Sequence, residues 1–237
     1  MTMTEIRYED REEGQAAYPS RVLILADRLR LDFGDDGEDF ILFDQRAGKV
    51  WHVGREARRI LVIVAETPRF TWPSDWSLKL DSMPSADNLI SRLWVNGQLC
   101  LEYKNDPGLR EDAGIMAEFR RALAGNHART WEATPEDLRD PCTLATEVRE
   151  AGVEYRDGLL LAARFWDGRV RVFQNRQSLP ARPDLFQLPA GFVTLQIGAA
   201  RTTDETQGRT GNQPAVNKGK GAGGKGKARQ PASSQRK

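Results

Sequence analysis

Histidines are the side chains best suited to acid–base chemistry near neutral pH, and the chain has only two, His52 and His127. Neither has a Cys, a second His or a carboxylate at the spacing that metal sites use. We therefore expect His52, between Trp51 and Val53, to be an ordinary strand residue, and His127 to follow the end of a helix. The sequence predicts no metal site, no cofactor and no catalytic residue.

Carboxylates are densest at Asp32, Asp35, Asp36, Glu38 and Asp39. Calcium favours several oxygen ligands on one tight loop. This run lacks the regular odd-position ligands and the distal Glu of an EF-hand loop. We therefore expect it to be the solvated tip of a hairpin.

Residues 219–227 alternate Gly and Lys in a way that superficially suggests a phosphate-binding loop. In such a loop the Lys is followed by Ser or Thr and opens a helix after a strand, whereas Lys225 precedes Gly226. The chain also contains no Gly-x-Ser-x-Gly, His-Glu-x-x-His or dinucleotide-binding motif. We expect a protein that is not an enzyme. A hydrolase would need an unforeseen constellation around His52 or His127.

The formal net charge of +1 is the sum of two parts of opposite sign. Nine of the 35 basic residues but only two of the 34 acidic ones lie beyond residue 200, so residues 1–200 carry −6 and residues 201–237 carry +7. Those last residues also hold seven of the 21 glycines and no aromatic side chain. Such a composition cannot bury enough apolar surface to fold. It predicts a disordered, basic, Gly/Lys-rich tail over residues 199–237.

A flexible basic segment binds polyanions by releasing their counterions. This predicts nucleic acid or an anionic membrane surface as a partner of the tail. The candidate residues are Lys218, Lys220, Lys225, Lys227 and Arg229. A solubilising tail with no dedicated ligand fits the same composition equally well.

Before the tail, apolar and polar residues alternate with the period of two that is typical of half-buried strands. Leu29, Leu31 and Phe33, for example, alternate with charged residues. Turn-bounded runs of this kind recur at roughly ten-residue spacing, which indicates an antiparallel meander. The predicted strands are residues 28–33, 40–43, 50–53, 59–64, 76–81, 93–95, 99–103, 158–166, 169–173, 185–186 and 192–197. The dipeptides Asn96-Gly97 and Asp167-Gly168 are typical of two-residue hairpin turns.

The middle of the chain changes to helical spacing, shown by Ile115, Met116, Phe119 and Leu123. Gly125-Asn126 is a predicted C-terminal stop of this helix. Thr134-Pro135 and Asp140-Pro141 each place a capping side chain before a Pro, which is typical of helix starts. We therefore expect two or three helices between about residues 110 and 151.

These patterns divide the chain into three parts. Residues 1–19 are predicted to be a flexible N-terminal segment, residues 20–198 a half-barrel domain with the helical insert, and residues 199–237 the tail. The longest apolar run, residues 60–65, is too short to span a membrane. The polar start of the chain is unlike a signal peptide. As it stands, the sequence predicts a cytoplasmic protein, and a leader upstream of Met1 would make it periplasmic.

Several short motifs occur in a characteristic order. Four strand motifs come first, then a Gly-x-x-Cys-x-x-Tyr strand, an Asp-Pro-Cys helix start and a closing Leu-Phe-x-Leu-Pro-x-Gly-Phe segment. They occupy residues 28–32, 39–44, 49–53, 59–63, 97–103, 140–145 and 185–192. This order resembles the lipoprotein-carrier (LolA/LppX-like) superfamily, and in particular an uncharacterised bacterial family within it.

The resemblance implies a mainly β (α+β) fold, in which a curved antiparallel sheet forms an unclosed half-barrel and the helical insert covers its concave face. It implies a non-catalytic protein that binds an apolar ligand, a lipid or a lipoprotein segment there. The candidate lining residues are Met116, Phe119, Leu123 and Trp131, each of which also suits a plain core position. The resemblance further implies a disulfide between Cys100 and Cys142 if the protein is exported. The alternative function is a protein-interaction module whose basic tail binds nucleic acid or an anionic membrane surface.

Overall fold

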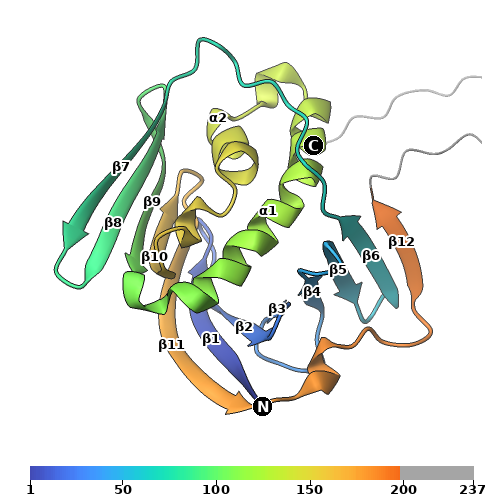
Figure 1. Cartoon of the computed structure of the whole chain (residues 1–237). Coiled ribbons are helices and arrows are strands. Elements are labelled where there is room, and N and C mark those ends of the chain that lie inside the picture. Colours follow the sequence, from blue (N-terminus) through green and yellow to red (C-terminus); the bar gives the residue numbers. More distant parts are fainter. Residues whose placement is uncertain (198–237) are drawn as a thin grey trace, which may run out of the picture. The chain divides into compact units, whose positions relative to one another are not determined.

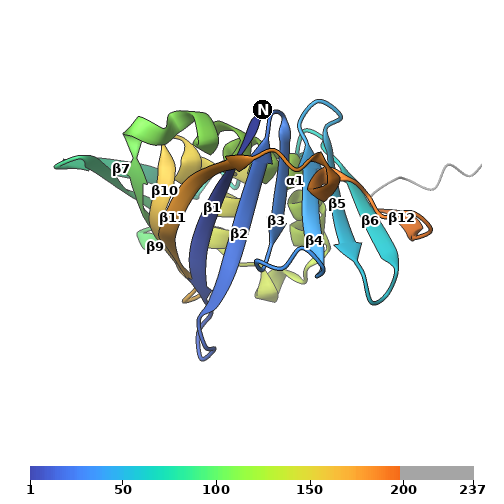
Figure 2. The ribbon, with the colours of Figure 1, turned by 90° about the horizontal axis from the view of Figure 1, so that it is seen from below.

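The computed structural model describes residues 1–197, and the predicted tail lies outside them. These residues form one twelve-stranded sheet of order β12-β6-β5-β4-β3-β2-β1-β11-β10-β9-β8-β7. The sheet is unclosed and wraps around helix α1 (Figures 1 and 2). The predicted mainly-β fold with a helical insert is confirmed. The strands are β1 (Thr2–Arg11), β2 (Tyr18–Leu25), β3 (Arg28–Asp32), β4 (Phe40–Asp44), β5 (Lys49–Gly54), β6 (Arg59–Val64), β7 (Leu78–Ser85), β8 (Asn88–Val95), β9 (Gln98–Asp106), β10 (Leu159–Phe165), β11 (Val170–Pro180) and β12 (Val193–Ile197).

The N-terminal residues form a strand in the middle of the sheet, so the prediction of a flexible segment over residues 1–19 was wrong. Strand β1 pairs with β2 on one side and β11 on the other. Ile6 and Tyr8 are almost fully buried beneath the helical layer. The segment looked polar because β1 also buries two carboxylates, Glu5 and Asp10, and these have arginine partners from neighbouring strands.

Pairing within the sheet is antiparallel except at one edge, where β12 runs parallel to β6. This corrects the expectation of a wholly antiparallel sheet. The turn at Asn96-Gly97 is confirmed, because both residues have positive φ, at 50° and 79°. At Asp167-Gly168 only Gly168 has positive φ, so this hairpin uses a longer loop closed by Phe165 and Arg169.

Helix α1 (Arg110–Ala133) is longer than predicted, because it continues through Gly125 and Asn126. A Cβ atom at position 125 would lie 2.5 Å from Cγ and 2.7 Å from the carbonyl oxygen of Glu66. Gly125 therefore allows a close approach between the helix and the chain after β6, and it does not end the helix. His127 consequently lies within α1 and not beyond its end.

Short helical segments flank α1. They are η1 (Pro107–Leu109), η2 (Glu136–Leu138), α2 (Pro141–Leu144), η3 (Ala145–Arg149), η4 (Val153–Tyr155) and, before β12, η5 (Pro183–Phe186). Asp140 caps α2 as predicted, since its side chain accepts from the backbone N–H groups of Cys142 and Thr143. Thr134 is not an N-cap. Its hydroxyl donates to the carbonyl of Thr130 at the end of α1.

The two faces of the sheet are covered differently. Helix α1 and the segments after it pack on the concave face, and the chain between β11 and β12 packs on the convex face. Leu185 and Phe186, which we expected in a strand, belong to η5 on that convex side, where they are buried against apolar residues of β2, β4, β5 and β6. No helix among residues 1–197 is long and apolar enough to span a membrane.

The acidic run at residues 32–39 is not simply a solvated hairpin tip. Asp32 is 3% exposed and accepts hydrogen bonds from Arg21 at 2.8 Å and from Arg30 at 2.7 Å. Arg30 in turn donates to the carbonyl of Leu185, and Asp36 binds Arg182. The run therefore ties the segment between β11 and β12 to the convex face.

Candidate functional site: an apolar groove beside helix α1

Register places the concave apolar side chains of β3, β4, β5, β6 and β12 in rows that cross the strands. In one row, which we call the covered row, each residue lies opposite the next and packs under α1. It consists of Leu29, Phe43, Val50 and Ile63. All four side chains are at most 5% exposed. The covered row is ordinary core.

The next row on the same face is only partly covered, since Leu31 and Ile41 pack against the core but no residue of α1 lines the groove above the row. It consists of Leu31, Ile41, His52, Leu61 and Leu195, and we call it the open row. Its first four members are half-buried and Leu195 is 45% exposed. Apolar side chains in register on a concave surface, without a protein layer above them, make a ready surface for an apolar ligand.

The open row forms the floor of a groove of about 550 Å³. This volume lies within the range of about 300–1,000 Å³ that is usual for small-molecule sites. Tyr18 and Phe33, whose rings meet edge to face 6.0 Å apart, contribute to one end, and Arg59 lies at the other. Burial lowers the pKa of His52, so its imidazole is neutral at pH 7 and belongs with the apolar floor.

A smaller cavity of about 180 Å³ lies between the sheet and α1 and shares Tyr18, Leu31, Asp10 and Arg171 with the groove. We call it the inner cavity. Met116 and Phe119 on α1 contribute apolar lining, and Arg120 and Glu154 contribute charge. Groove and inner cavity are therefore neighbours, with an apolar floor in one and a charged wall in the other.

The buried charged groups of the inner cavity pair with one another. Asp10 accepts hydrogen bonds from Arg171 at 2.7 and 2.8 Å and from the Ser20 hydroxyl at 2.6 Å. Arg120 donates to Glu147 at 2.7 Å, and its Nε lies 3.0 Å from a Glu154 carboxylate oxygen without a well-directed hydrogen bond.

Burial and ion pairing shift the pKa values of the two carboxylates beside Arg120 in opposite directions. Glu154 is 3% exposed, and this burial raises its pKa even though Arg120 acts in the opposite direction. For Glu147, burial is outweighed by Arg120 and His127, which together hold its pKa at about 2. His127, in which we expected no special role, thus serves as a partner of Glu147, with Nδ1 at 3.0 Å from the carboxylate.

The four predicted lining residues are separated by the structure. Met116 and Phe119 line the inner cavity, and Phe119 packs against Phe43 of the covered row. Leu123 is buried in the core and lines neither the groove nor the inner cavity. Trp131 lies near the other end of α1, in a hollow with His127 and Glu147. The predicted tail residues Lys218, Lys220, Lys225, Lys227 and Arg229 lie outside the described residues.

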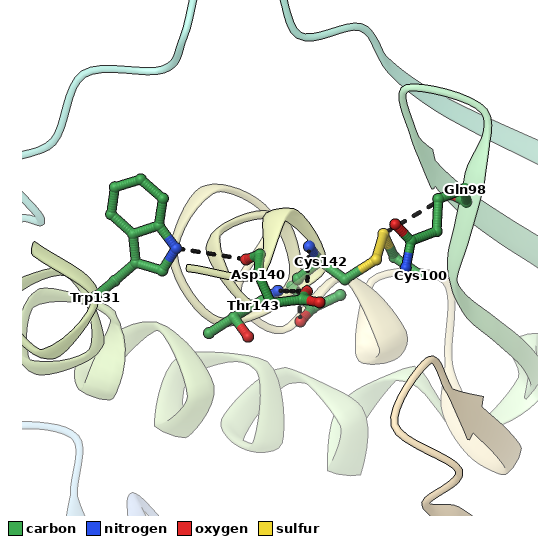
Figure 3. Close-up of a disulfide and its surroundings, with 7 residues drawn as sticks. Gln98, Cys100, Trp131, Asp140, Cys142 and Thr143 are labelled. Atoms are coloured by element: carbon green, nitrogen blue, oxygen red, sulfur yellow. Dashed lines mark hydrogen bonds between the residues drawn. A yellow bond between two sulfur atoms is a disulfide. The ribbon is translucent and has the colours of Figure 1, made fainter. Parts of the chain in front are cut away.

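Cys100 on β9 and Cys142 on α2 form a disulfide, with their Cα atoms 5.0 Å apart (Figure 3). Both residues are fully buried. The bond joins the helical layer to the sheet, beside the Asp140 cap that begins α2. Among the described residues, no group of three or more His, Cys, Asp or Glu side chains could hold a metal ion.

The open row was missed from the sequence, although its strands were predicted. Alternation indicates that Leu29 and Leu31 share a face, but it cannot say that α1 covers one and leaves the other open. Leu195 joins the row only because β12 pairs in parallel with β6, a long-range pairing with no local signal.

No family model and no curated protein sequence matches the chain. Among solved structures, an uncharacterised conserved protein from Thermus thermophilus is similar at 11% identity and a TM-score of 0.40, over 82% of this chain and 90% of that one. PNGF-II is similar at 12% identity and a TM-score of 0.38, over 84% of this chain but only 31% of its own. The resemblance to the lipoprotein-carrier superfamily is tested by none of them and stays a prediction.

Proposed function

We propose that this protein is a non-catalytic binding protein that holds an apolar ligand in the groove on the concave face of its sheet. The ligand is a lipid, or the acylated or apolar segment of a partner such as a lipoprotein. The observation that carries this proposal is the open row, an in-register line of apolar side chains that α1 leaves uncovered.

Physical chemistry supports a bound chain over an empty groove. Half-buried Leu31, Ile41 and Leu61 keep part of their apolar surface in contact with water. Covering such surface stabilises a complex by roughly 25 cal/mol for each Å² removed from water. Most charges near the groove are engaged with one another, and an uncharged chain leaves those pairs intact.

Native mass spectrometry of the purified protein, followed by solvent extraction, tests the proposal. We expect a co-purifying amphiphile, or saturable binding of a fluorescent apolar probe such as the methyl ester of cis-parinaric acid. A protein that co-purifies with no amphiphile and binds no such probe would contradict it.

The charge distribution favours a second candidate function for residues 201–237, which carry nine basic and two acidic residues. In this proposal they bind nucleic acid or anionic vesicles by counterion release. Binding should weaken steeply with salt and disappear when residues 201–237 are deleted. Unchanged binding by the truncated protein would exclude these residues as the cause.

A further inference from the structure

We infer that the ligand of the groove is a long-chain amphiphile with an anionic headgroup, held by Arg59 at the β6–β12 end, with its chain along the open row toward α1. This inference rests on the proposed function and adds the charge of the headgroup and the direction of the chain.

The groove has the shape for a chain. Its lining extends from Tyr18 and Ser20 on β2, across β3, β4 and β5, to Arg59 on β6 and Leu195 on β12. Five steps between neighbouring strands, at about 4.8 Å each, make a path of about 24 Å. An extended chain laid across the strands contacts every member of the open row, whereas a compact ligand contacts only a few.

At the inner end of this path the buried charges are paired, and the exposed Arg11 lies next to Glu12, which lines the same cavity. Asp10 and Arg171 neutralise each other through two hydrogen bonds, and the Ser20 hydroxyl occupies Asp10 as well. Arg120 is shared between Glu147 and Glu154. A charged headgroup that entered between these groups would have to break one of the buried pairs, which is unfavourable because it leaves an uncompensated charge.

The β6–β12 end of the groove, which we call the outer end, differs from the inner end because it contains Arg59. Arg59 lies in register with Gly54 and Val193, is exposed and lines the groove. Within residues 1–197 it forms no ion pair and no side-chain hydrogen bond. The neighbouring Arg55, by contrast, donates to the carbonyls of Glu38 and Asp36.

The other charged groups at this end form no ion pair with Arg59 among residues 1–197. Asp39, which also lines the groove, accepts the backbone N–H of Arg55. Glu56 is exposed in the turn between β5 and β6, and Arg58 lies over the ring of Phe192. Of the charged groups that line this end of the groove, Arg59 is therefore the cation, and Asp39 is already held by the backbone of Arg55. A guanidinium at the end of an apolar groove suits an anion, because it binds carboxylate or phosphate oxygens through charge-assisted hydrogen bonds.

The test compares cis-parinaric acid with its methyl ester at pH 8, since the two fluorescent probes differ only in the ionised carboxylate. We expect the full-length protein to bind the acid about tenfold more tightly than the ester. Arg59→Gln should lower the ratio of acid affinity to ester affinity from about ten to about one. Arg59→Lys should restore most of the preference. Arg164→Gln, which removes an exposed arginine from β10, serves as the matched control.

The outcomes separate this inference from the proposed function. Equal binding of acid and ester by the unaltered protein would overturn the inference while leaving the proposed function in place. Arg169 lines the inner cavity. If the preference for the acid over the ester survives Arg59→Gln but disappears in Arg169→Gln, the headgroup lies at the inner cavity and the proposed direction of the chain is wrong. Failure to bind either probe would count against the proposed function itself.

Discussion

His52 on β5 lies directly opposite Leu61 on β6, and both side chains belong to the open row on the concave face of the sheet. Two pairs further along the same strands, Val50 lies opposite Ile63 and is buried beneath α1. The edge of the helix thus separates a packed core from a groove on one continuous surface, and the proposed function depends on that boundary.

A charge placed in the open row should abolish binding of an apolar ligand. Leu61→Glu puts a carboxylate on the floor of the groove, and we expect the affinity for the methyl ester of cis-parinaric acid to fall at least about tenfold, since burying an unpaired charge is costly. Val64→Glu is the matched control, because Val64 is 38% exposed and strand alternation points it to the convex face. Equal binding by both variants would place the ligand elsewhere.

Lowering the pH should weaken the binding of an uncharged ligand, because His52 becomes charged. Burial lowers the pKa of this imidazole below its usual 6.5, so the side chain is neutral at pH 7 and gains its charge only at more acidic pH. The affinity for the uncharged ester should therefore be constant from pH 8 to about 6.5 and decline at lower pH. His52→Gln should remove the decline, and His127→Gln should keep it. Fluorescence titrations across this pH range provide the measurement.

The first strand should be essential for stability. Ile6 is fully buried in the middle of the sheet, and Ile6→Ala should lower the free energy of unfolding by about 2–5 kcal/mol. Glu9→Ala, at an exposed position of the same strand, should change it by less than about 0.5 kcal/mol. Denaturant unfolding of both variants measures these changes in the free energy of unfolding. Similar stabilities would mean that β1 is not part of the folded core.

The disulfide should stabilise the attachment of the helical layer. It closes a loop of 42 residues, for which loop entropy predicts a contribution of about 4 kcal/mol. The double variant Cys100→Ala, Cys142→Ala should lose about this amount in denaturant unfolding. A thiol reductant should destabilise the unaltered protein similarly and leave the double variant unaffected. Two free thiols in the purified, unreduced protein would contradict the bond.

Whether the protein is exported from the cytosol can be tested through the redox state of its two cysteines. Disulfides persist in oxidising compartments and are rare in the cytosol. If the protein is exported, the Cys100–Cys142 bond should be present in cells and the mature N-terminus should follow a removed leader. Thiol labelling of cell lysates and N-terminal mass spectrometry measure both.

Most strands could be predicted because alternation is a local signal. Asn96-Gly97 and the Asp140 cap are also local, and both were predicted correctly. Strand β1 was missed because Glu5 and Asp10 make its sequence look solvated, although arginines from β2 and β11 neutralise them. Glu5 also pairs with Arg7 on its own strand, but Arg171 lies far from Asp10 in the sequence, and no local pattern indicates that pairing.

The candidate site was harder to predict than the fold. Helical spacing marked Met116, Phe119 and Leu123 equally, yet only the first two line the inner cavity. The groove itself arises from three relationships: the register of the consecutive strands β3 to β6, the parallel addition of β12, and the position of α1 across the sheet. The last two join segments that are far apart in the sequence, so they cannot be read from a window of neighbouring residues.

Methyl-resolved NMR gives the most direct test of the claim that the open row binds an apolar ligand. Ile and Leu methyl resonances would be followed while the methyl ester of cis-parinaric acid is added. We predict saturable shifts for the methyls of Leu31, Ile41 and Leu61, and little change for Leu42 and Ile60, which are buried on the convex face. Absence of shifts along the open row, or shifts confined to the convex face, would contradict the account.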